Sequence, residues 1–145
     1  MHFETNNKMV EPDIIDKVYE KFEGHTWYLQ IMFNELYSLT STDKICNLLM
    51  FNEALTNIIA TQEFTYQEIL SRLPEKQKEI LIAIAREEKA SAVTSGDFIR
   101  KYNLHTPSSV QSALKYLTGK DLVTQENKVF QVYDRFFGIW LKQNF

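Results

Sequence analysis

The stretch TPSSVQSALKYLTGKDLVTQENKVFQVYD, residues 106–134, contains the change of pattern that decides the fold. Thr106-Pro107 provides a cap and a first helical residue, and Gly119 is a usual helix stop. In the second half the apolar period shortens, so residues 122–124 and 129–133 predict two strands around a turn at residues 126–128. The stretch therefore predicts a helix over residues 107–118 followed directly by a β-hairpin. The inward positions of that helix are Val110, Ala113, Leu114 and Leu117.

The residues on either side complete a helix-turn-helix arrangement. A strong helix begins at Leu73-Pro74-Glu75, its end at Glu87-Glu88 is expected to be solvated, and a loose segment follows. Ser95 is expected to cap a short helix that ends before a tight turn at residues 103–105. After the hairpin, Asp134 is expected to cap a last helix. This order of helices, turn and hairpin predicts a winged helix-turn-helix domain.

The N-terminal part predicts a small bundle of helices. A first helix begins near Pro12 and ends before Gly24. Thr26 is expected to cap the second helix, and either Ser41 or Thr42 to cap the third. The apolar spacing predicts no strand in this part of the chain.

These patterns divide the chain into two predicted domains. Residues 1–62 form the helical bundle, and residues 63–145 form the winged helix domain. A short linker is expected near residues 61–65, followed by a short helix over residues 66–73. The predicted fold class is therefore mainly α, with a small helical bundle followed by a winged helix-turn-helix domain that has a short β-hairpin wing.

The composition is that of an ordinary globular protein. The chain has 145 residues and a net charge of −3, with 44% hydrophobic and 24% charged residues. Residues 1–72 hold 11 acidic and 5 basic residues, whereas residues 73–145 hold 8 acidic and 11 basic residues, which supports two parts with different surfaces. No apolar run is long enough to cross a bilayer, and no signal peptide pattern is present. We therefore expect a cytoplasmic protein with no membrane partner.

The outward face of the predicted helix over residues 107–118 is the first candidate site. It presents small hydroxyls, an amide and one lysine, which are groups that contact base edges and phosphates, and the wing could contact the DNA backbone. The candidate DNA contacts are Ser108, Ser109, Gln111, Ser112, Lys115, Lys120, Asn127 and Lys128. However, residues 107–128 contain three lysines, two acidic residues and no arginine, and phosphate binding needs many cations. The weak charge favours the alternative, a packing or regulatory surface.

No group of residues assembles a catalytic or metal site. The sequence lacks the glycine-rich phosphate loops G-x-x-x-x-G-K-[ST] and G-x-G-x-x-G. His2, His25 and His105 do not have the spacing of metal ligands, and Cys46 lies among apolar positions where it is expected to be buried and inert. We therefore predict no catalytic residue, no metal and no enzyme activity for this chain alone.

The segment Gly24-His25-Thr26-Trp27-Tyr28 is the second candidate site. A glycine at a helix break beside aromatic residues can form one wall of a ligand site. The residues alone favour a simpler interpretation, in which the glycine ends a helix and the aromatic rings belong to the core.

Three segments together resemble the C-terminal region of prokaryotic AAA+/STAND-type P-loop ATPases, in the archaeal-ATPase-like branch. They are Phe22-Glu-Gly-His-Thr-Trp-Tyr28, Leu73-Pro-Glu-Lys-Gln-Lys-Glu-Ile-Leu81 and Val132-Tyr-Asp-Arg-Phe-Phe-Gly-Ile-Trp140. In that family an ATPase core is followed by a helical lid and a winged helix domain. The resemblance covers nearly the whole chain and implies that residues 1–62 are the lid.

The resemblance also implies where a nucleotide would lie. The family has a Gly-x-Pro segment near the bound adenine, and its equivalent here is Gly24, His25 and Thr26, so only the glycine matches. The phosphate loop, ATP and Mg²⁺ would belong to an upstream core, and this chain would be a fragment of the longer protein. The resulting expectation is a non-catalytic regulatory and interaction module whose partners are that core and another protein. The alternative is a free-standing winged helix transcriptional regulator that binds DNA.

Overall fold

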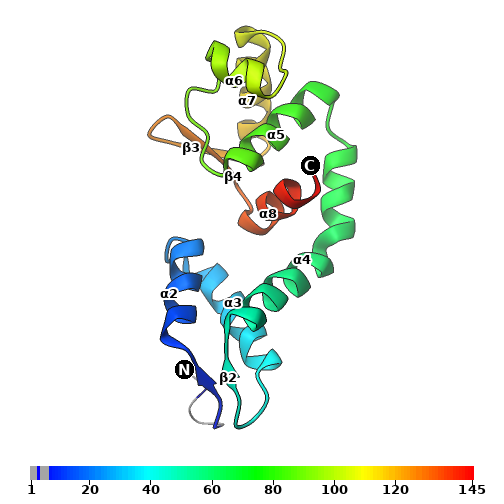
Figure 1. The fold of residues 1–145 in the computed structure, drawn as a ribbon. Coiled ribbons are helices and arrows are strands. Elements are labelled where there is room, and N and C mark those ends of the chain that lie inside the picture. Colours follow the sequence, from blue (N-terminus) through cyan, green and yellow to red (C-terminus); the bar gives the residue numbers. More distant parts are fainter. Residues whose placement is uncertain (1–2, 4–6) are drawn as a thin grey trace. The chain divides into compact units, whose positions relative to one another are not determined.

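The computed structural model describes Phe3 and residues 7–145 and divides into two compact units, residues 1–61 and 62–145. Figure 1 shows the helices and strands of both units. The mainly helical fold with a winged helix-turn-helix and a β-hairpin, as predicted from the sequence, is confirmed. In the described part of the chain, no helix has the length and apolar character that a membrane span requires.

In the first unit, two helices flank the turn at Gly24. Helix α2 spans Pro12–Lys21, with proline in its first turn as predicted, and α3 spans Thr26–Leu39. Gly24 has φ 71°, which glycine adopts without a steric penalty. The predicted cap at Thr26 is wrong by one residue: His25 occupies the N-cap and makes no side-chain capping bond, so Thr26 is the first helical residue.

Two short strands in the first unit contradict the prediction that this part has none. Strand β1, Met9–Val10, pairs in parallel with β2, Ile45–Cys46. The Asp43 N–H donates to the Asn7 carbonyl over 3.0 Å, which holds the two segments side by side. Because these partners are far apart in the sequence, no local periodicity indicates the pairing.

Helix α4 spans Leu48–Ser71, where the sequence analysis predicted two helices and a linker. The predicted caps Ser41 and Thr42 are wrong, because the side chain of Asn47 accepts a hydrogen bond from the Met50 N–H at 3.2 Å and begins the helix. Ile45, Leu48 and Leu49, the apolar residues on either side of Cys46 in the sequence, are exposed. Residues 48–71 contain neither glycine nor proline, so nothing in the backbone interrupts the helix at residues 61–65.

The second unit contains the winged helix arrangement, whose helices begin where the capping residues were predicted. Ser95 accepts a hydrogen bond from the Phe98 N–H, and Asp134 accepts hydrogen bonds from the Phe136 and Phe137 N–H groups. The elements are α5 (Glu75–Glu87), α6 (Gly96–Lys101), α7 (Pro107–Gly119), β3 (Val123–Glu126), β4 (Val129–Val132) and α8 (Arg135–Asn144).

The core of the second unit joins α8 to the C-terminal part of α4. Tyr66 is buried and stacks on Phe137, with ring centroids 4.9 Å apart, and its ring lies 5.8 Å from that of Trp140. Helix α5 packs against α7, α8 and β4, and its inward residues Ile80, Leu81 and Ile84 are buried. Tyr66 and Leu70, in the C-terminal part of α4, are buried and therefore belong to the hydrophobic core of the winged helix unit.

Candidate interaction surface

Helix α7 begins with a reciprocal cap that uses two of the candidate DNA contacts. The Ser109 N–H donates to Thr106 Oγ1 over 3.2 Å, and the Thr106 N–H donates to Ser109 Oγ over 3.1 Å. Ser108 Oγ lies 3.2 Å from Thr106 Oγ1. Ser109 is half-buried and its hydroxyl also donates to the Thr106 carbonyl, so its hydrogen-bonding groups serve the helix start.

The outward side of α7 is an almost uncharged surface. We call it the α7 face, and it consists of Ser108, Gln111, Ser112, Lys115 and Tyr116. All five residues are exposed and recur at helical spacing, as expected for one side of a helix. Lys115 is the only charged residue in α7, whereas α5, of the same length, contains six.

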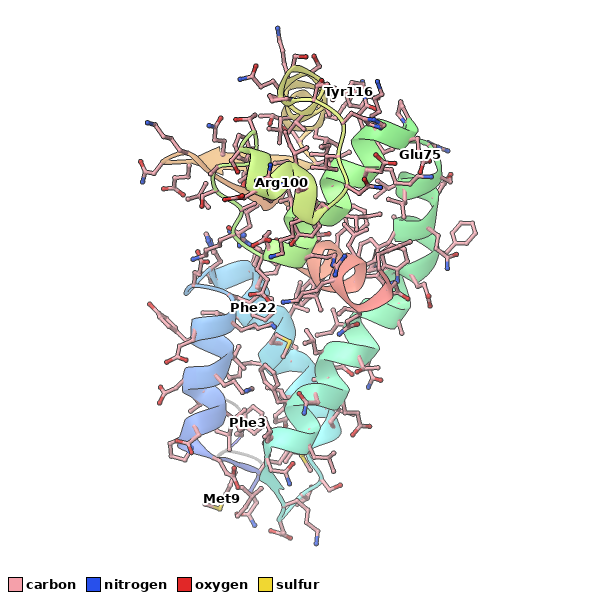
Figure 2. The ribbon with its side chains drawn as sticks, turned by 45° about the horizontal axis from the view of Figure 1, so that its top comes forward. Phe3, Met9, Phe22, Glu75, Arg100 and Tyr116 are labelled. Atoms are coloured by element: carbon pink, nitrogen blue, oxygen red, sulfur yellow. The ribbon has the colours of Figure 1, made fainter. Side chains whose placement is uncertain are left out.

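Tyr116 is a further exposed residue of α7 that was not among the predicted contacts. Its exposed fraction is 38%, and Figure 2 labels it on α7. Lys120 Nζ lies 5.8 Å from the centroid of its ring, a cation–π distance. The spacing of Tyr116 from Ser112, one helical turn, was the available signal.

The wing is a regular hairpin whose tip is formed by Asn127 and Lys128. Both tip residues are exposed and have positive φ angles of 50° and 65°, which matches the two-residue turn that suits the twist of a hairpin. The hairpin extends away from the helices of the second unit in Figure 1 and Figure 2. Lys120, directly after α7, is also exposed.

The predicted loose segment after α5 contributes a third strand-like contact to the wing. The Ala90 N–H donates to the Phe130 carbonyl over 2.8 Å, and the Phe130 N–H donates to the Ala90 carbonyl over 2.7 Å. Ala90 is buried. This pairing covers one edge of β4, and a single residue is too short a strand to produce an alternating pattern.

The end of α5 is a charged cluster and not the simple solvated end that was predicted. Glu87 accepts hydrogen bonds from Lys101 Nζ at 2.7 Å and from the Tyr102 hydroxyl, and these bonds lower the pKa of the Glu87 carboxyl. Burial, and then the contact with Glu87, raises the pKa of Tyr102. Glu88 accepts a hydrogen bond from Lys142 Nζ at 2.7 Å. The two adjacent carboxylates thus bind lysines of α6 and α8.

The candidate nucleotide-proximal residues lie together at the turn between α2 and α3. Gly24 is half-buried beneath the ring of Tyr19, whose nearest atom would lie 2.8 Å from a Cβ at this position. His25 and Thr26 are exposed. The aromatic residues are divided: Tyr28 stacks on Phe22 at 5.2 Å, whereas Trp27 is 60% exposed.

The cysteine and the possible metal ligands are the remaining residues that the sequence singles out. Cys46 is buried, and this burial raises the pKa of its thiol. Among the described residues, no three of the histidine, cysteine, aspartate and glutamate side chains form a group that could hold a metal ion.

Comparison with known proteins gives one family. A family model described as a probable winged helix domain matches residues 64–143, more than half of the chain. No curated protein and no solved structure matches the chain.

Proposed function

The chain belongs to the probable winged helix domain family, and from this premise we propose that it is a non-catalytic regulatory and interaction module. The winged helix unit presents the α7 face to a protein partner. In the same proposal, the N-terminal unit is the lid of a larger AAA+/STAND-type ATP-binding protein, and the module couples the nucleotide state of that protein to its partner.

The observation that carries the proposal is the chemistry of the α7 face. A single lysine among serine, glutamine and tyrosine side chains provides little attraction for phosphates. Few charges and an exposed tyrosine are typical of the centre of a protein–protein interface. Because the cap at Thr106 also holds Ser109, fewer hydroxyls of α7 are available to read base edges.

The proposal that the parent protein is an ATPase is supported by the order and spacing of the three segments that resemble AAA+/STAND proteins. Sequencing the gene upstream of Met1 tests it directly. A continuous reading frame that encodes a G-x-x-x-x-G-K-[ST] loop after a strand is the expected result. A stop codon and a ribosome-binding site directly before Met1 would contradict it.

The regulatory role is tested in the full-length protein with a matched pair of substitutions. Gln111→Glu adds a charge to the α7 face, and Gln143→Glu makes the same change at an exposed position of α8. Coupling between sites is typically worth a factor of about five or more, so we expect Gln111→Glu to change the rate of ATP hydrolysis by at least about fivefold. Gln143→Glu should leave the rate unchanged. Equal rates for both variants and the wild type would exclude this role for the α7 face.

A second candidate function is DNA binding, which the position of the lysines favours. Lys115 on α7, Lys120 directly after it and Lys128 at the wing tip are all exposed, so these cations are available to contact phosphates. Three such contacts predict a slope of about −2.7 in a plot of log binding constant against log salt concentration. Titration of a labelled duplex from about 50 mM salt upward tests this, and Lys115→Ala should reduce the slope by about 0.9. Absence of binding at about 50 mM salt would exclude DNA and leave the protein partner.

A further inference from the structure

The turn after α5 connects this helix to the wing, and its backbone is strained. Glu88 has φ 66° and ψ −60°, a conformation that is uncommon for any residue other than glycine. The Lys89 N–H donates to the Glu87 carbonyl over 2.8 Å, which closes a three-residue turn of a rare and strained type. Such a conformation persists only where surrounding contacts fix it.

Two contacts on opposite sides of Glu88 fix this turn. Two residues further along the chain, Ala90 makes both of its backbone hydrogen bonds to Phe130 of β4, at 2.8 and 2.7 Å. The Glu88 carboxylate itself accepts a hydrogen bond from Lys142 Nζ of α8 at 2.7 Å. The backbone pairing holds the wing to the turn, and the ion pair holds the turn to α8.

We propose that the Glu88 turn is a latch that holds the wing against the helices, and that the Glu88–Lys142 ion pair keeps the latch closed. When the ion pair breaks, the closed turn loses part of its stabilisation, and Ala90 separates from Phe130 more often. The hairpin itself remains intact, because its ladder from Val123–Val132 to Glu126–Val129 does not involve residues 88–90.

The exposure of the ion pair makes the latch responsive to its surroundings. The side chains of Lys142 and Glu88 are 47% and 62% exposed. Attraction between such charges is weakened by salt and by any anion that competes for the lysine. An anionic group that binds Lys142 would compete with Glu88 and open the latch. The position of the wing would then depend on whether that group is bound. Opening of the latch does not depend on which partner contacts the α7 face.

Amide hydrogen exchange in the full chain tests the latch. The Ala90 and Phe130 amides report its opening, and the Tyr133 amide, which donates to the Leu122 carbonyl at the base of the hairpin, is the internal reference. Lys142→Met removes the charge and retains most of the side-chain volume. We expect exchange at Ala90 and Phe130 to become about two- to fivefold faster, the range for an exposed ion pair, with little change at Tyr133.

Four further measurements complete the test. Lys142→Arg should restore slow exchange, and Lys115→Met, on α7, should have no effect on either amide. Raising the salt concentration should accelerate exchange at Ala90 and Phe130 in the wild type but not in Lys142→Met. Glu88→Gly removes both the strain and the ion pair, so its exchange should be insensitive to salt. Unchanged exchange in Lys142→Met, or equal acceleration at Tyr133, would overturn the proposal.

Discussion

At the scale of single residues, the same amino acid has opposite roles at two positions of the winged helix unit. A Cβ at Gly138 of α8 would lie 3.2 Å from the Cβ of Val132, which is buried. A Cβ at Gly119, the last residue of α7, would have no neighbouring atom within 4 Å. The first glycine permits a close approach of α8 to the wing, whereas the second is not required by packing.

This difference predicts opposite effects of the same substitution. Gly138→Ala should destabilise the unit by about 1 kcal/mol, because overpacking costs about 1–3 kcal/mol and outweighs the gain in helix propensity. Gly119→Ala should be neutral or stabilising by up to about 0.5 kcal/mol, since it is a helix-terminal position. Both changes in the free energy of unfolding are measured by urea titration in a Trp27→Phe background. Trp140 is then the only tryptophan, and its fluorescence reports unfolding. Two changes of the same sign would contradict the packing argument.

The contacts of Glu87 predict a dependence of stability on pH. Hydrogen bonds from Lys101 and Tyr102 lower the pKa of the Glu87 carboxyl in the folded state. The resulting stability is fully present above the unfolded pKa of about 4.3 and is lost as the pH falls through the lower, folded pKa. Glu87→Gln should therefore lose less stability than the wild type between pH 7 and pH 3.

The control for this prediction is Glu75→Gln, which removes an equivalent charge at the other end of α5. Urea midpoints at the two pH values are compared for the three proteins. If Glu87→Gln and the wild type lose the same stability on acidification, the bonds to Lys101 and Tyr102 contribute nothing in solution.

At the scale of elements, the two-residue turn of the wing has the backbone geometry that suits a hairpin, but its second residue is a lysine in the left-handed conformation. Lys128 has φ 65° at the second turn position, where asparagine-glycine is the preferred pair. A residue other than glycine in this region costs about 1–2 kcal/mol, and part of that is recovered when glycine replaces it. Lys128→Gly should therefore stabilise the winged helix unit by about 0.5–1 kcal/mol in the urea assay.

Lys128→Ala is the matched variant for the turn. It removes the same charge but keeps a Cβ in the left-handed conformation, so it should produce no gain. Equal stabilisation by alanine and glycine would show that removal of the charge, and not relief of the backbone, is responsible.

The elements predicted correctly are those whose signals are local. Ser95, Thr106 and Asp134 cap helices within three residues of their own position, and the predicted helices begin there. The elements that were missed depend on distant partners: β1 pairs with a strand 36 residues away in the sequence, and Ala90 pairs with Phe130. The predicted break in α4 is wrong for a local reason: residues 48–71 contain neither glycine nor proline, so the backbone continues as one helix.

The candidate surface could likewise be predicted only where its signals are local in the sequence. Helical spacing identified Gln111, Ser112 and Lys115 as exposed, as the structure has them. The engagement of Ser109 by the cap could have been inferred from its spacing of three residues from Thr106. The exposure of Tyr116 could have been inferred from its spacing of four residues from Ser112. The ion pair between Glu88 and Lys142 depends on how the helices pack, which a single sequence does not specify.

At the scale of the whole molecule, α4 is divided between the two compact units. The winged helix unit therefore needs part of α4 in order to fold, which can be tested with fragments. Residues 62–71 of this helix supply Tyr66 and Leu70, both buried, to the winged helix unit. Tyr66 stacks on Phe137 and lies close to Trp140, so it links α4 to the aromatic side of α8. A winged helix unit that begins at Glu75 would lack these contacts.

We therefore predict that a fragment of residues 62–145 unfolds cooperatively, whereas a fragment of residues 75–145 is less stable by several kcal/mol or does not fold. Tyr66→Ala in the longer fragment separates packing from helix length, and it should cost about 3 kcal/mol, as truncation of a buried aromatic residue does. Emission from Trp140, the only tryptophan in either fragment, reports the transition during urea titration. A shorter fragment as stable as the longer one, or a Tyr66→Ala variant with unchanged stability, would show that the fold of the winged helix unit is complete without α4.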